Sequence, residues 1–177
     1  IVQYRVPFVI TSLGHPGAVV RAVHAYGGLV FSDVIHADHA RKALAAGVDG
    51  IVAVASGSGG HAGTQSAFSL VREISEFWDG TLILGGAISD GYAVRAAEVL
   101  GADFAYLGTR FIATRESSAP EAYKQMLVEA EAKDIVYTDK QPLLESETLE
   151  LEGTNGLPAY AAGDAYTIRY KQIGEPK

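Results

Sequence analysis

The sequence predicts an α/β fold made of parallel βα repeats. Short apolar runs start near residues 8, 29, 51, 81 and 104, and each has the length of a buried strand. A segment with a helical pattern follows each run. Strands that alternate with helices in this way lie parallel in one sheet, joined by right-handed crossovers.

The elements follow from local signals along the chain. Pro16 lies near the start of the first helix, where its missing N–H does no harm. Asp90 is a good N-cap, and Gly101 ends the helix that Asp90 begins. We expect strands at 8–11, 29–31, 50–55, 81–84 and 104–107, and helices at 17–26, 36–46, 66–78, 91–100 and 120–132.

The helix at 66–78 has the clearest pattern. Its apolar residues recur at helical spacing and form one continuous stripe, which predicts a face buried against the sheet. These residues are Ala67, Leu70, Val71, Ile74, Phe77 and Trp78.

Two short segments repeat. Ala46–Gly50 (AGVDG) and Leu100–Phe104 (LGADF) each end a helix with glycine, place an aspartate in the turn and start a strand. The repeat supports the division into βα units.

Composition limits the possible functions. The chain has 177 residues, of which 48% are hydrophobic and 20% charged, as expected for a globular protein with one core. A net charge of −7 argues against nucleic acid as a partner. No cysteine is present, which excludes disulfides and Cys-ligated zinc and fits a cytoplasmic location. No apolar run has the length of a membrane span.

The character of the chain changes after Lys140. Residues 148–152 (TLELE) alternate in polarity, Asn155-Gly156 is a hairpin-type turn signal, and 165–170 (AYTIRY) forms a second β pattern. The sequence therefore predicts a βα portion at 1–140 and a short β-rich tail at 141–177.

The stretch Val52–Gly63 (VAVASGSGGHAG) is the main candidate for chemistry. It begins as an apolar strand and opens into a glycine-rich loop that carries His61. Glycines let the backbone approach a ligand closely, and a histidine suits acid–base chemistry near neutral pH. The alternative interpretation is a tight turn with an exposed histidine. A nucleophilic triad is disfavoured, since the chain has no cysteine and no Gly-x-Ser-x-Gly elbow.

The active site of βα repeats lies at the carboxyl ends of the strands. Glycine-rich loops there offer backbone N–H groups to an anion such as phosphate. Arg110 is expected either to point at a phosphate or to have a solvated or structural role. The residues expected at the carboxyl ends of the five strands are Thr11-Ser12, Asp33, Ser56–Gly63, Gly85–Ala87 and Gly108-Thr109.

The remaining histidines carry less weight. His24 lies on the apolar face of a helix and is expected to be a core or edge histidine. His36 and His39 flank a helix start and are expected to be solvated. His36 and His39 could hold a metal only with a carboxylate from elsewhere, which the sequence does not indicate. We therefore predict no metal site.

Three motifs in register, VASGSGGHAG, ILGGAISDG and GADFAYLGTRFIAT, resemble the nitronate monooxygenases, formerly called 2-nitropropane dioxygenases. VPFVITSLG and HAYGGLVFSDV are also similar, so that the resemblance covers residues 1–139. It implies an FMN-dependent TIM barrel, of which this chain carries the equivalents of strands 4–8. It further implies oxidation of nitronates or nitroalkanes with O2, by a protein that can be a homo-oligomer.

The resemblance also implies residue roles. His61 matches the catalytic histidine, and Gly60 and Gly63 would lie beside the flavin. The pair Gly85 and Gly86 matches one phosphate loop, and the pair Gly108 and Thr109 matches the other.

Two departures leave alternatives open. The first three barrel strands have no counterpart, and the tail from Gln141 does not resemble the family, so the chain is expected to be a fragment, a shortened relative or a sequence with pieces left out. Related flavin barrels include NAD(P)H-dependent quinone and enoyl-acyl-carrier-protein reductases, which gives a rival enzyme function. A non-catalytic half-barrel with a structural role is the third possibility.

Overall fold

A computed structural model describes residues 1–137 and 165–168. The chain divides into two compact units. Unit 1 contains residues 1–56 and 63–106. Unit 2 contains residues 57–62 and the chain from 107 onward. The predicted boundary at residue 140 lies outside the described residues and stays a prediction.

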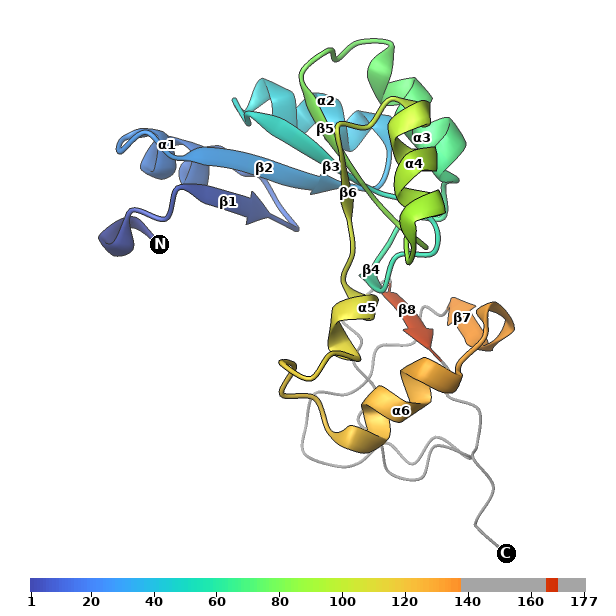
Figure 1. Cartoon of the computed structure of the whole chain (residues 1–177). Helices are drawn as coiled ribbons and strands as arrows, with labels where there is room; N and C mark the ends of the chain where they lie inside the picture. Colours follow the sequence, from blue (N-terminus) through green and yellow to red (C-terminus); the bar gives the residue numbers. More distant parts are fainter. Residues whose placement is uncertain (138–164, 169–177) are drawn as a thin grey trace, which may run out of the picture. The chain divides into compact units, whose positions relative to one another are not determined.

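Unit 1 is built on a parallel sheet with the strand order β1-β2-β3-β5-β6 (Figure 1). All four pairings are parallel, so the predicted α/β fold of βα repeats is confirmed. β1 and β6 are the outer strands. The strands span Phe8–Thr11 (β1), Leu29–Val34 (β2), Gly50–Val54 (β3), Thr81–Gly85 (β5) and Phe104–Tyr106 (β6).

Four helices connect these strands: α1 (Gly17–His24), α2 (Ala37–Ala45), α3 (Ala67–Ser75) and α4 (Gly91–Leu100). Three residues of the predicted stripe on α3, Leu70, Val71 and Ile74, are fully buried. The helix ends at Ser75 rather than at Trp78, so Phe77 and Trp78 lie beyond it and pack against the core only partly buried. The Asp90 side chain accepts a hydrogen bond from the Ala93 N–H at 2.9 Å and so caps α4 as expected.

The core of unit 1 lies between the helices and one face of the sheet. Because strand side chains alternate between faces, this face carries every second residue of each strand. Its members pack with α1 to α4 in one cluster, which accounts for most of the buried apolar side chains. The sheet residues of this cluster include Val9, Val30, Val34, Ile51, Ala53, Leu82 and Leu84.

On the opposite face of the sheet, several large apolar side chains near the outer strands are exposed. Phe8 pairs with Leu29 there, and the two side chains are 42% and 49% exposed. Phe104, on the other outer strand, is 61% exposed. One row across this face runs through Asp33, Val52, Ile83 and Phe104, as the strand register shows.

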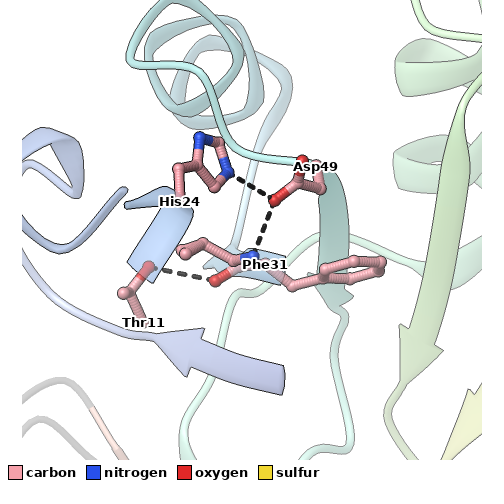
Figure 2. A network of polar contacts seen from close by, with 5 residues as sticks. Thr11, His24, Phe31 and Asp49 are labelled. Carbon is pink, nitrogen blue, oxygen red and sulfur yellow. Dashed lines mark hydrogen bonds and ion pairs between the residues drawn. The ribbon is translucent and has the colours of Figure 1, made fainter. Parts of the chain in front are cut away.

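Aspartates tie neighbouring strands together at the amino end of the sheet, and Figure 2 shows the contacts of one of them, Asp49. The Asp49 carboxylate accepts a hydrogen bond from the Val30 N–H at 2.7 Å and lies 2.8 Å from Nε2 of His24. Asp103 accepts in the same way from the Leu82 N–H at 2.8 Å. The repeated sequence segments therefore form equivalent ties, and His24 is an edge histidine that supports one of them.

We expect Asp49→Ala to lower the free energy of unfolding by about 1–2 kcal/mol, because the Val30 N–H loses its acceptor. Urea unfolding of the full chain measures the change. Asp79→Ala is the matched control, since Asp79 is exposed between α3 and β5 and its removal should change stability by less than about 0.5 kcal/mol. Equal stabilities of the two variants would contradict a structural role for the tie.

Unit 2 contains α5 (Thr109–Ile112), α6 (Glu121–Glu129) and a small antiparallel sheet with the order β4-β8-β7. β4 is Gly60–His61, β7 is Ile135–Tyr137 and β8 is Ala165–Ile168. The β pattern expected at 165–170 is thus present as β8. The expected segment at 148–152 and the turn at Asn155-Gly156 lie outside the described residues.

Several element boundaries differ from the expectations. The second strand continues to Val34 rather than ending at Phe31, because Asp33 and Val34 still pair with β3. The polar residues Ser32 and Asp33 interrupt the apolar run, so the sequence pattern predicted a shorter strand. The short helices Val2–Tyr4, α5 and Ala132–Asp134 were not expected, and α6 is shorter than 120–132 at both ends.

Candidate functional site

In unit 1, the carboxyl end of β3 brings two of the predicted glycines together. Gly85 pairs with Val54 across the sheet, and the Gly85 carbonyl accepts from the Ala55 N–H at 2.9 Å. The Gly63 N–H donates to the Val54 carbonyl at 3.4 Å. Gly63 and Gly85 therefore both hydrogen-bond to the backbone of Val54 and Ala55 at the end of β3.

Gly63 is held in a space too small for a side chain. A Cβ atom built there would lie 2.9 Å from both Cβ and the carbonyl oxygen of Ile35, and 3.1 Å from the Val54 carbonyl oxygen. Two of these three neighbours are backbone atoms, which cannot move aside like the end of a flexible side chain. The glycine is thus required by close approach of the chain between β2 and α2.

The loop after β5 has an unusual backbone. Gly86 has φ +131° and Ala87 has φ +54°, in the left-handed region that residues with a Cβ atom rarely adopt. Such strain of about 1–3 kcal/mol is often found at ligand-binding loops. The loop links β5 to the Asp90 cap of α4, so it lies at the carboxyl end of the sheet where phosphate-binding loops occur.

In unit 2, the glycine loop 57–62 and the start of α5 lie next to each other. Thr109 Oγ1 is 3.3 Å from the position that a Cβ atom would take at Gly59. The space beside Gly60 and Gly108 is open, with no atom within 4 Å of a Cβ built at either residue. Ser58 Oγ, in the same loop, is buried and has no hydrogen-bond partner among the described residues.

His61 lies in a different local structure from the one expected. The sequence placed it in a loop, but the backbone of Gly60–His61 forms the strand β4. His61 pairs with Ala165 and Gly60 with Tyr166 of β8. Within unit 2, β8 therefore pairs with the backbone at the end of the glycine loop.

Asp33 is a half-buried carboxyl group in the second-last position of β2. Its Oδ1 atom is buried and has no hydrogen-bond partner among the described residues. Burial raises the pKa of the Asp33 carboxyl above its ordinary value of 3.8, and a hydrogen bond with the Ser12 side chain partly offsets this. The sequence placed Asp33 at a strand end, but burial of one unpaired oxygen has no sequence signal.

A raised pKa gives a defined pH dependence. The folded chain binds the Asp33 proton more tightly than the unfolded chain, so the stabilisation is fully present below pH 3.8 and is lost as pH rises through the folded pKa. We expect the stability of the wild type relative to Asp33→Asn to increase as pH falls toward 3.8. Urea unfolding of both proteins across this range measures it, and a difference that does not vary with pH would refute the titration.

The other histidines lie outside these loops. His36 caps α2, where its Nδ1 accepts from the His39 N–H at 3.3 Å, and the two rings lie 3.6 Å apart. His15 Nδ1 accepts from the Gly17 N–H at 3.2 Å. Arg110 is exposed in α5. Within 1–137 and 165–168, no group of three His, Cys, Asp or Glu side chains could hold a metal ion. In the same part of the chain, no helix is long and apolar enough to span a bilayer.

The family model described as nitronate monooxygenase matches residues 1–142. This chain belongs to the nitronate monooxygenase family. The nitronate monooxygenase of Neurospora crassa is 37% identical to it over 120 residues, which are 63% of this chain and 32% of that protein. The chain thus spans about a third of the length of this member of the family.

Solved structures agree with the fold. FabK from Thermotoga maritima has a TM-score of 0.74 and 35% identity, over 77% of this chain and 44% of that chain. A nitroalkane oxidase from Streptomyces ansochromogenes has a TM-score of 0.64 and 29% identity, over 71% of this chain and 40% of that chain. Both fold as TIM barrels, so the parallel sheet of unit 1 is part of that fold.

Proposed function

We propose that this chain carries the catalytic part of an FMN-dependent oxidoreductase that oxidises nitronates or nitroalkanes with O2. The observation that carries the proposal is the match of residues 1–142 to the nitronate monooxygenase family. His61 and the three glycine loops lie in the sequence motifs that resemble this family. A small-molecule substrate, a cytoplasmic location and a homo-oligomer belong to the same proposal.

The residues present fit a flavin nucleotide. The spaces beside Gly60 and Gly108 are open, and Ser58 Oγ is a buried polar atom that lacks a partner among the described residues, as expected for groups that face a ligand. Gly86 has a φ of +131°, a backbone conformation that favours glycine, in one of the loops proposed to bind the phosphate. We propose that Gly60 and Gly63 lie beside the flavin ring, while Gly85, Gly86, Gly108 and Thr109 bind its phosphate.

Bound FMN supplies the redox chemistry, taking electrons from the nitronate and passing them to O2. The chain positions the reactants and handles the proton. We propose that His61 hydrogen-bonds the nitro group and, where the substrate is a neutral nitroalkane, takes the proton from the carbon next to that group. A preformed nitronate has already lost that proton and needs only the hydrogen bond.

Reconstitution with FMN tests the proposal against its two rivals. We expect the purified full chain to bind FMN, seen as visible absorbance that stays with the protein, and to consume O2 when nitronate is added. A chain that FMN cannot reconstitute would favour the structural half-barrel. A flavoprotein that reduces quinone with NADH but ignores nitronate would favour the reductase.

A further inference from the structure

The carboxyl group of Asp33 is polar but lies among apolar neighbours. On the sheet face opposite the core, its neighbours in the row across β3 and β5 are Val52 and Ile83. Val52 is fully buried, and neither side chain can donate a hydrogen bond. The neighbouring strand β1 ends at Thr11, and the next residue, Ser12, supplies the hydrogen bond that Asp33 receives.

One oxygen of this carboxyl group is left without a partner. Oδ1 is buried and accepts no hydrogen bond from any described residue. Leaving a buried charged acceptor unpaired is costly, so such a group in a native protein calls for an explanation.

The other aspartates of the sheet show what a purely structural role looks like. Asp49 and Asp103 lie at the amino ends of the strands, and both accept backbone hydrogen bonds. Asp33 lies near the carboxyl end, where parallel βα folds bind their ligands. Asp33 therefore differs from the two structural aspartates in its position on the sheet and in having a carboxylate oxygen without a partner among the described residues.

We propose that Asp33 is a flavin contact, in which Oδ1 accepts a hydrogen bond from an O–H or N–H donor of the bound cofactor. The inference rests on the proposed function and adds a residue to it. A flavin offers two kinds of donor, the hydroxyls of the ribityl chain and the N–H of the ring. The phosphate is excluded as the partner, because two negative charges would repel each other.

This assignment predicts opposite effects on stability and on binding. Asp33→Val replaces the unpaired carboxyl by a strand-favouring apolar side chain that matches Val52 and Ile83. We expect the flavin-free variant to melt about 2–4 °C higher than the wild type. We expect its FMN dissociation constant to rise about 10- to 100-fold, since a charge-assisted hydrogen bond is lost.

The experiment titrates FMN into flavin-free wild type, Asp33→Val, Asp33→Asn and Ser12→Ala, and follows quenching of flavin fluorescence. Asp33→Asn keeps a neutral acceptor, so its affinity should fall between those of the wild type and Asp33→Val. Ser12→Ala removes only the internal hydrogen bond and should weaken binding less than Asp33→Val. Lumiflavin, which lacks the ribityl chain, locates the donor. If Asp33→Val also weakens lumiflavin binding, the donor is the ring N–H. If it weakens only FMN binding, the donor is a hydroxyl of the ribityl chain.

Other outcomes overturn the contact. Unchanged or tighter FMN binding by Asp33→Val would show that Asp33 does not contact the flavin. A lower melting temperature together with unchanged affinity would show in addition that its carboxyl group has a structural role. If the wild type binds no flavin, the proposed function fails and the contact fails with it. If the wild type binds and Asp33→Val binds equally well, only the contact fails.

Discussion

Replacement of His61 by asparagine should lower turnover of neutral nitroalkanes about 10²–10⁴-fold while FMN stays bound. The proposed base is lost, but the residues assigned to the phosphate are untouched. Turnover of preformed nitronate should fall less, because no carbon-bound proton has to be removed. The asparagine also keeps the backbone pairing of β4 with Ala165, so the loop should retain its conformation.

Steady-state kinetics on both substrate forms measure this difference. His24→Asn is the matched control, since His24 lies at the amino end of the sheet beside Asp49, and we expect its turnover to stay near that of the wild type. An equal fall on both substrates with FMN retained would mean that His61 is not a base. Loss of FMN from the variant would instead make His61 a structural part of the loop.

Gly63→Val should lower the free energy of unfolding by about 3 kcal/mol, near the upper end of the usual cost of overpacking. The new side chain would enter the space held by the backbone of Ile35 and Val54, where a single Cβ atom already lies at 2.9–3.1 Å. This is a large fraction of the stability of a typical domain, so FMN binding should be lost as well.

Chemical unfolding and FMN absorbance test the prediction together. Gly91→Val is the matched control, because no atom lies within 4 Å of a Cβ at Gly91, which is exposed at the start of α4. Similar stabilities of the two valine variants would show that the space around Gly63 is not restrictive.

The sequence predicted the βα repeats well because their signals are local. A strand start is an apolar run after a turn, and the strands predicted to start at 8, 29, 50, 81 and 104 start at these residues in the structure. The aspartates of the repeated turns, Asp49 and Asp103, also turned out to have equivalent roles.

What the sequence missed depends on contacts between distant residues. The pairing of Gly60–His61 with Ala165 joins a two-residue strand to the tail, and no short-range pattern reports such a partner. The extension of β2 to Val34 depends on its neighbour β3. The unpaired Oδ1 of Asp33 is a feature of packing, since the sequence shows only an aspartate near a strand end.

Anaerobic reduction of the FMN-loaded full chain tests the central claim most directly. We expect a primary or secondary alkyl nitronate to bleach the visible flavin absorbance and admission of O2 to restore it. NADH in place of nitronate should have no effect. Bleaching by NADH with no response to nitronate would contradict the claim.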